Sequence, residues 1–309
     1  MAFASVSSTY AGDALKAYIL KALIGGETLS TTGISVETNV KFKRKIKKLA
    51  STGIVQEGSC EFSPTSGMTI SEGVLEPQSI KVNESLCFDE FDNLWDSADM
   101  AAGQHAQNVP AELTNAITTE FTNQASKEIE ELIWQGNTDG STGTIKDLID
   151  GYEKILTATG ATGSVKVSGT TLTTSNILTE LNKVYNALPS GVRKKGKDNL
   201  VIFMSYEAAA LYEMNLQAQG VNTSADSGVM KVYGIEIKPV GGLSNSNTIV
   251  IGARNNFYVG TDLQSDFNEI KLIDMRETTG DDAVRFIMKM KIDVTIAYAN
   301  EVVYYRIPA

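Results

Sequence analysis

At 309 residues, with 42% hydrophobic and 21% charged residues, the chain is long enough to bury one large core or two modest ones. No apolar run approaches the roughly 18 residues that span a bilayer. The N-terminus also lacks the basic and apolar regions of a signal peptide, so we expect no membrane contact. The net charge of −10 excludes the overall basic character that is typical of a free nucleic-acid binder.

The first part of the chain predicts an arm followed by extended strands. Residues 14–23 are weakly amphipathic and too short for a stable isolated helix, and Gly25-Gly26 ends them. From 31 to 86, apolar residues such as Val36, Val40 and Phe42 alternate with polar ones between Gly and Pro, as they do in strands. This segment is too polar to form its own core, so we expect it to lie on another surface.

A long helix is predicted from Asn108 to Trp134, with Pro110 in its first turn and Gly136 after its end. At about 1.5 Å per residue it would be close to 40 Å long. Its apolar residues recur every three or four positions: Leu113, Ile117, Phe121, Ala125, Ile129, Leu132 and Ile133. Residues 145–157 predict a short helix, and the Gly-, Thr- and Ser-rich segment 157–174 predicts a loop or small hairpin between two lobes.

The last third predicts alternating helices and strands. We expect a helix from Ile177 to Pro189, and a helix capped by Ser205 that runs to about Gln217. The predicted strands are 200–204, 232–240, 248–251, 257–259 and 270–275. The strongest periodic signal is a final strand with alternating apolar residues on one face: Phe286, Met288, Met290, Ile292, Val294, Ile296 and Tyr298. After a turn at Ala299-Asn300, residues 302–307 are expected to pair back.

Few residues suggest catalytic or binding chemistry. Residues 191–198, Gly-Val-Arg-Lys-Lys-Gly-Lys-Asp, approach the P-loop motif. However, Asp198 replaces the magnesium-binding Ser or Thr, and a helix rather than a strand precedes them. His105 is the only histidine, which argues against a triad and against a histidine metal site. The only cysteines, Cys60 and Cys87, exclude a disulfide framework.

The other candidates have structural interpretations. Asp281-Asp282 fits a polar turn better than a metal site. Glu128, Glu130 and Glu131 are expected on the polar side of the long helix, as a solvated or intersubunit face, and Trp134 is expected to anchor the core. We therefore predict no catalytic, cofactor-binding or metal-binding residues, no cofactor, and a protein that is not an enzyme.

The sharpest charge feature is a run in which six of eight residues are basic: Lys41, Lys43, Arg44, Lys45, Lys47 and Lys48. These residues could contact an acidic neighbouring copy of the chain, contact nucleic-acid phosphates, or form a solvated strand face. The overall acidity favours the first interpretation. A chain of charge −10 with a local segment of charge +6 is complementary to itself.

The order of these elements resembles that of tailed-phage major capsid proteins, which have the Hong Kong 97 fold. Both have an N-terminal arm, an extended loop, a long spine helix, an axial lobe and a return through a long strand. Several phrases are also similar to the family, from about residue 130 onward. They are LIWQGN at 132–137, the helix, basic loop, strand and helix of 184–211, VYGIEI at 232–237, and IVIG at 249–252 followed by Tyr258-Val259.

The resemblance implies an α+β, Hong Kong 97-like fold in five segments. These are an N-terminal arm (1–30), an extended E-loop-like β excursion (31–86), a peripheral lobe with the spine helix (87–174), an axial lobe (175–280) and C-terminal strands returning to the peripheral lobe (281–309). The implied function is a major capsid protein that assembles with itself, as pentamers and hexamers, into an icosahedral shell. That shell encloses the double-stranded DNA genome of a phage, without sequence-specific binding.

Further expectations follow from the same resemblance. The protein would belong to the virion capsid, be assembled in the host bacterial cytoplasm, and have portal, scaffolding or decoration proteins as partners. Nothing before the arm resembles the cleaved scaffolding segment of some relatives, so we expect any scaffold to be a separate protein. Because the extended loop has many basic residues, no single Lys can be assigned to the covalent crosslink of other relatives, and we predict none.

Three alternatives remain open at this stage. A bacterial nanocompartment (encapsulin-like) shell protein shares the fold, and genomic neighbours would separate it from a phage protein. An α+β hydrolase or transferase would need a convergent cluster of titratable groups that we cannot assemble. A phage tail or adhesin component predicts a β-dominated chain, which the long helix contradicts.

Overall fold

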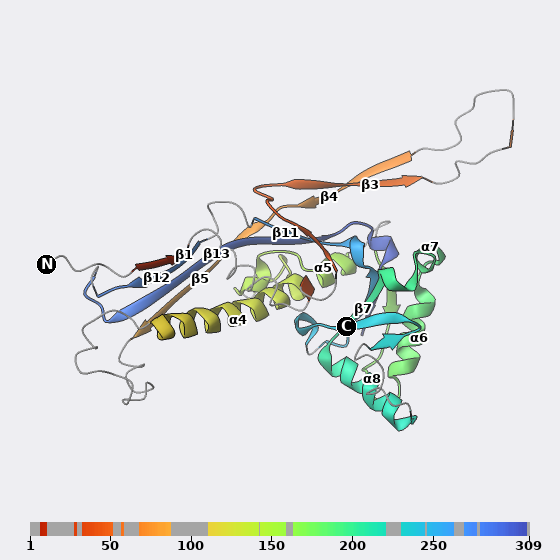
Figure 1. The fold of residues 1–309 in the computed structure, drawn as a ribbon. Helices are drawn as coiled ribbons and strands as arrows, with labels where there is room; N and C mark the ends of the chain where they lie inside the picture. The colour runs from red at the N-terminus through yellow and green to blue at the C-terminus, as the bar shows by residue number, and fades with distance from the viewer. Residues whose placement is uncertain are drawn as a thin grey trace.

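The computed structural model describes residues 7–10, 28–29, 33–51, 57–58, 68–87, 111–141, 143–158, 163–220, 230–244, 246–262, 269–276 and 279–307. Figure 1 shows an elongated molecule with a sheet toward each end, a long helix along one of them, and a hairpin that projects from the body. Within the described part of the chain, no helix is both long and apolar enough to cross a membrane. The predicted stretch at 14–23 lies outside the described residues.

The first sheet is built around one long strand, β13 (Ala283–Ile296). The order across the sheet is β1 (Ser7–Tyr10), β12 (Glu269–Asp274), β13, β11 (Phe257–Thr261) and β2 (Ser35–Glu37), and β5 (Gln78–Cys87) also pairs with β13. Every second residue of β13 is buried from Val284 to Ile296, and the residues between are at least partly exposed. This alternation confirms the predicted strand, although Tyr298 lies beyond its end.

The long helix is α4 (Ala111–Gln135), about 37 Å in length at 1.5 Å per residue. Its predicted start at Asn108 lies outside the described residues. Ala125, Ile129, Leu132 and Ile133 are buried, as their spacing predicts. The rings of Phe121 on the helix and Phe286 on β13 are 5.0 Å apart, so α4 packs on the first sheet.

Two glycines let the chain cross itself closely after α4. A Cβ on Gly136 would lie 2.5 Å from the Ile149 carbonyl oxygen, and one on Gly151 would lie 2.7 Å from the Trp134 carbonyl oxygen. The Gly151 N–H donates to the Gly136 carbonyl at 2.9 Å. Gly136 therefore ends the helix, as predicted. The single short helix expected at 145–157 is instead split by Gly151 into a 3-10 turn (Ile145–Asp147) and α5 (Tyr152–Thr157).

The second sheet has packed side chains on both faces. Its strand order is β6 (Val165–Ser168), β14 (Val303–Arg306), β10 (Ile249–Ala253), β7 (Leu200–Met204), β9 (Ile235–Pro239) and β8 (Lys231–Val232). On β7, Val201 and Phe203 join the core under the first sheet. Leu200, Ile202 and Met204 join a second core that includes α6 (Ile177–Ala187) and α8 (Tyr206–Ala218). The predicted cap is present, because the Ser205 hydroxyl accepts from the Ala208 N–H at 3.1 Å.

Two strand predictions and one loop prediction in this part of the chain were wrong. Residues 232–240 do not form one strand, because Tyr233 and Gly234 adopt φ of +52° and +80° and turn the chain between β8 and β9. Residues 302–307 do not pair back on the long strand, because β14 pairs with β10 and β6. The segment 157–174 is not only a loop or hairpin, since β6 pairs in parallel with β14.

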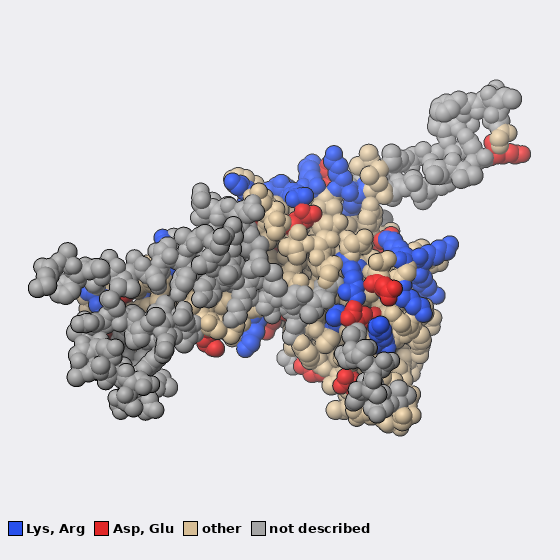
Figure 2. Space-filling view, in the orientation of Figure 1, with Lys and Arg blue, Asp and Glu red and all other residues tan. Residues whose placement is uncertain are grey.

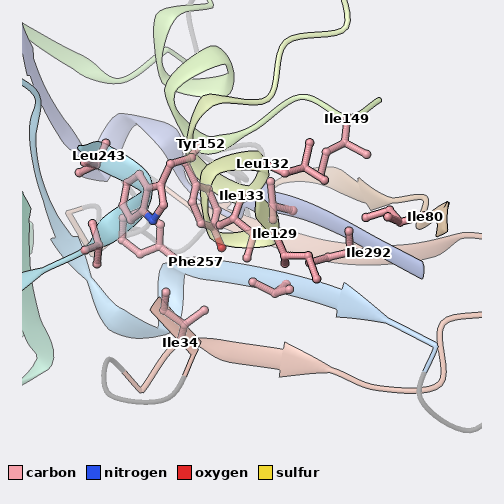
Figure 3. Packing of buried hydrophobic residues seen from close by; sticks show 14 of the residues in the cluster. Ile34, Ile80, Ile129, Leu132, Ile133, Ile149, Tyr152, Leu243, Phe257 and Ile292 are labelled. Atoms are coloured by element: carbon pink, nitrogen blue, oxygen red, sulfur yellow. The ribbon is translucent and has the colours of Figure 1, made fainter. Parts of the chain in front are cut away.

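Four buried aromatic rings join the two sheets. Trp134 of α4 contacts Tyr152 of α5 and Phe203 of β7, with ring centroids 5.2 and 5.0 Å apart. Phe257 of β11 completes the ring, at 5.4 Å from Tyr152 and 5.3 Å from Phe203. All four contacts are edge-to-face, which aromatic quadrupoles favour. Figure 3 shows Tyr152 and Phe257 side by side among the surrounding aliphatic side chains.

Truncating one of these four aromatic side chains should destabilise the whole protein. We expect Phe203→Ala to lower the free energy of unfolding by about 3–5 kcal/mol, because Phe203 is fully buried and its loss leaves a cavity between the sheets. Phe42→Ala is the matched control. Phe42 is 82% exposed, so its truncation should change stability by no more than about 0.5 kcal/mol. Urea unfolding curves measure both, and equal effects would contradict the packing described here.

Candidate assembly surface

The clearest candidate site is the hairpin of β3 (Arg44–Ser51) and β4 (Met68–Leu75), which pair antiparallel. Figure 1 shows β3 and β4 standing apart from both sheets, above β11. Opposed side chains share a face in such a ladder. One face, the exposed hairpin face, consists of three cross-strand pairs that are all solvent-exposed: Lys45–Val74, Lys47–Glu72 and Leu49–Ile70.

The exposed hairpin face carries large apolar side chains that have no core to enter. Leu49 is 55% exposed, Ile70 62% and Val74 39%. Leu49 and Ile70 are directly opposite each other, so their apolar surfaces adjoin. A two-stranded ribbon is marginal alone, and grouped apolar residues on a projecting ribbon mark an interaction site. The sequence indicated strands here, but it did not show which residues would lack a packing partner.

The structure separates the basic run into several environments. Arg44, Lys45, Lys47 and Lys48 lie on β3 and alternate between its two faces, and Lys41 and Lys43 precede the strand. Figure 2 shows basic side chains gathered where the hairpin meets the body. Three of the six residues form ion pairs with acidic residues of the same chain: Lys43–Glu76 at 2.9 Å, Arg44–Glu37 at 2.9 Å and Lys45–Glu72 at 2.5 Å.

These ion pairs leave the cations accessible. The side chains of Lys43, Arg44 and Lys45 are 54%, 51% and 59% exposed, and exposed pairs contribute about 0–1 kcal/mol each. Lys41 and Lys47 form no ion pair with any residue in the described ranges. The sequence prediction counted six free charges. It missed the three glutamates that offset half of them, because those pairs depend on the strand register.

A few polar contacts attach the hairpin to the first sheet. The Tyr298 hydroxyl accepts from the Leu49 N–H at 3.1 Å and donates to the Leu49 carbonyl at 3.2 Å. Lys48 Nζ donates to the Ile296 carbonyl at 3.2 Å, and burial lowers the pKa of this amine. Both contacts are made to residues at the C-terminal end of β13: Ile296 is its last residue, and Tyr298 lies two residues beyond it. These hydrogen bonds, together with the fully buried Leu75 at the end of β4, position the base of the hairpin.

An acidic cleft lies at the base of the hairpin. It has a volume of about 420 Å³, and its lining includes Glu76, Asp150 and Asp293. Asp293 Oδ2 accepts from the Glu76 N–H at 2.6 Å. Burial raises the pKa of Asp293, backbone N–H donors partly oppose this, and the nearby charges of Glu76 and Asp150 raise it further. Among the described residues no group of three or more His, Cys, Asp or Glu could hold a metal ion.

The other sequence candidates fall in separate places. Residues 190–193 form α7 (Ser190–Arg193), and the P-loop-like segment then leads into strand β7, so it has the reverse order of a P-loop. Asp281 accepts from the Thr279 hydroxyl at 2.7 Å in an exposed turn. His105 and Cys60 lie outside the described residues.

One of the three helix glutamates was placed wrongly. Glu131 pairs with Lys146 at 2.9 Å and Glu128 accepts from Gln124, but Glu130 is only 4% exposed rather than on the polar side. Glu130 hydrogen-bonds to the backbone and hydroxyl of Thr28. Trp134 is fully buried, as predicted for a core anchor, and its indole N–H donates to the same hydroxyl at 2.7 Å.

Solved capsid structures are similar to this chain over most of its length. The capsid of cyanophage A-1(L) shares 15% identity at a TM-score of 0.60, over 90% of this chain and 92% of the other. The procapsid of satellite phage P4, with its size determination protein, shares 14% at 0.59, over 97% and 92%. A virus-like particle from Pyrococcus furiosus shares 14% at 0.53, over 94% and 97%. The chain has the Hong Kong 97 capsid fold.

At these identities the similarity is one of fold. No protein-family model matches the chain, and no curated protein matches its sequence. The Hong Kong 97 fold confirms the predicted α+β class and the resemblance to tailed-phage capsid proteins. The boundaries of the five predicted segments stay a prediction.

The raised pKa of Asp293 predicts a pH-dependent stability. A carboxyl that binds its proton more tightly in the folded state adds stability below its unfolded pKa. That stability is lost as pH rises through the folded value. Relative to Asp293→Asn, the wild type should therefore gain unfolding free energy as pH falls from neutrality toward 3.8, the ordinary value. Urea unfolding at several pH values measures this difference. A difference that is constant with pH, or that shrinks as pH falls, would contradict the assignment.

Proposed function

We propose that this chain is a major capsid protein that assembles with copies of itself into the icosahedral shell of a tailed phage. The shell encloses a double-stranded DNA genome. The observation that carries the proposal is the combination of the Hong Kong 97 fold with a projecting hairpin on which Leu49, Ile70 and Val74 are exposed to solvent. When a neighbouring subunit covers such a surface, apolar area is removed from water, and this burial favours association of the subunits.

The hairpin supplies both components of a subunit contact. Leu49, Ile70 and Val74 provide apolar area that a neighbour can remove from water. The basic residues Lys41, Lys43, Arg44, Lys45, Lys47 and Lys48 provide attraction to a chain whose net charge is −10. A contact between two different surfaces of identical subunits repeats from copy to copy, and it closes into rings where the rotation permits. We propose this contact as the basis of pentamers and hexamers.

The remaining parts of the proposal follow from the same role. The protein would be located in the virion capsid after assembly in the host bacterial cytoplasm. Its role is structural rather than catalytic, and portal, scaffolding or decoration proteins would be its further partners. The five-segment division, with an arm at 1–30 and an extended loop at 31–86, is part of this proposal.

A nanocompartment shell is the second candidate. Similarity to the virus-like particle from Pyrococcus furiosus, over 94% of this chain, favours it. The TM-score of 0.53 is lower than the 0.60 and 0.59 found for the two phage structures. The phage capsid is therefore the better supported of the two.

Charge reversal on the hairpin should weaken assembly without unfolding the subunit. We expect the triple variant Lys43→Glu, Arg44→Glu and Lys47→Glu to lose large particles, because these side chains are exposed and contribute little to the fold. Sedimentation velocity measures particle mass, and circular dichroism measures folding of the subunit. Normal particle yield from this variant would contradict a role of the basic residues in assembly.

The apolar residues can be tested separately. The double variant Leu49→Ser and Ile70→Ser keeps all charges and removes the apolar centre of the exposed hairpin face, so it should also lose particles. Tyr206→Ser and Met214→Ser on α8 provide a matched control, since these side chains are 46% and 55% exposed away from the hairpin. Equal particle loss from both pairs would show that exposed apolar surface in general, and not the hairpin, is what assembly requires.

A further inference from the structure

A second basic surface lies on the other half of the molecule. From the last residue of α7 onward, residues 193–199 are all exposed, and they include Arg193, Lys194, Lys195 and Lys197. Gly196, at φ +92°, lets the chain turn between these cations. Figure 2 shows basic side chains clustered over α7, at the end of the second sheet. This cluster stands out because the whole chain is acidic.

The β8–β9 turn lies against this segment. A Cβ on Gly234 would lie 3.0 Å from Lys197 Cδ and 3.5 Å from its Nζ, so the lysine crosses the turn directly. The turn also presents Lys231, which is exposed, and Tyr233, which is 42% exposed. Two segments separated by more than thirty positions in sequence thus place their cations on one surface.

Aromatic stacking and hydrogen bonds fix the position of Arg193 in this surface. The Arg193 guanidinium lies over the Tyr185 ring at 5.2 Å, and the Tyr185 and Tyr233 rings are 4.6 Å apart. Arg193 also donates to the Asn186 carbonyl at 2.6 Å and to the Leu188 carbonyl at 3.1 Å. Tyr233 has φ +52°, a conformation that bulky residues rarely adopt. Its ring contact with Tyr185 offsets that local strain.

Most of these cations have no acidic partner. Lys195 pairs with Glu301 at 2.5 Å. Lys194, Lys197 and Lys231 form no ion pair with any other residue that the structure describes. Lysine is depleted from the centres of protein–protein interfaces, and Tyr233 is the single exposed large hydrophobic residue among the members of this surface. Flexible lysines beside a fixed arginine and a tyrosine are instead suited to a row of phosphates.

We propose that this basic-aromatic patch, formed by Tyr185, Arg193, Lys194, Lys195, Lys197, Lys231 and Tyr233, binds the phosphate backbone of double-stranded DNA. The inference rests on the proposed function and deepens it, since the enclosed genome is the ligand. It assigns the α7 end of the second sheet to the interior of the shell. Binding is independent of sequence and falls with salt, because each phosphate contact releases counterions. Because the chain as a whole is acidic, DNA is attracted to this small patch and not to the rest of the shell wall.

The test compares two charge-matched variants of the full chain. Lys194→Gln with Lys197→Gln removes two unpaired cations from the patch. Lys81→Gln with Lys127→Gln removes two exposed cations from β5 and α4. Fluorescence anisotropy of a labelled random-sequence DNA duplex, titrated with unassembled protein at several salt concentrations, gives the affinity and its salt slope. Electron microscopy of the same samples under assembly conditions reports shell formation.

We expect the patch variant to lower the slope of log K against log salt by about two, at about 0.9 per phosphate contact. At roughly 0.1 M salt this corresponds to an affinity loss on the order of 50-fold. The control should bind DNA as the wild type does, and both variants should form shells. Equal binding by the two variants, or a wild type that does not bind at low salt, would overturn the proposal.

Two further outcomes separate this inference from the proposed function. A patch variant that binds DNA normally but forms no shells would overturn the inference, and it would identify a second copy of the chain as the partner of the patch. A wild type that never assembles, yet binds DNA through the patch, would support the DNA contact and contradict the shell.

Discussion

The closed ring of Trp134, Tyr152, Phe203 and Phe257 holds the two sheets in one body, because each residue comes from a different element. Trp134 belongs to the long helix, Phe257 to the first sheet and Phe203 to the second. All four are fully buried, and each edge-to-face pair adds about 0.5–1.5 kcal/mol beyond burial of its area. The Trp134 N–H also requires a buried partner, which the Thr28 hydroxyl provides. The N-terminal part of the chain is thereby tied to the same centre.

The hairpin follows a different physical principle. Leu75 at its base is fully buried, but Leu49, Ile70 and Val74 stay exposed, and Tyr298, Lys48 and Asp293 hold the base through hydrogen bonds. Hydrogen bonds of this kind contribute about 0.5–1.5 kcal/mol each, far less than the packed centre. The protein thus combines a rigid body with a weakly attached, chemically exposed extension. Such a division suits a subunit that must keep its own shape while completing its contacts on a neighbour.

Much of the fold could be predicted because burial leaves a period in the sequence. Strand β13 was recognisable from its alternating apolar residues, and α4 from apolar residues every three or four positions. The errors arose where backbone geometry or pairing decided the outcome. Tyr233 adopts a left-handed conformation that its residue type does not favour, and β14 pairs with strands distant in sequence. Glu130 was expected on the polar side of α4, as part of a solvated or intersubunit face, but it is buried and hydrogen-bonds to Thr28, about a hundred residues away.

The candidate site was only partly predictable for the same reason. The basic run from Lys41 to Lys48 is visible in the sequence. The pairing of three of its six cations with Glu37, Glu72 and Glu76 follows from strand register. The exposure of Leu49 and Ile70 follows from the absence of a covering element in the described chain. The patch around Arg193 is similar. Its lysines are evident as a motif, but their convergence with Lys231 and Tyr233 depends on the fold.

The role proposed for the exposed hairpin face requires that many copies of the chain assemble. Electron microscopy of the purified wild-type chain, with light scattering on the same sample, tests this directly. We expect closed shells with icosahedral symmetry and a mass far above that of the 33.3 kDa subunit. A chain that stays a monomer or dimer, even with scaffolding proteins present, would contradict the proposed shell.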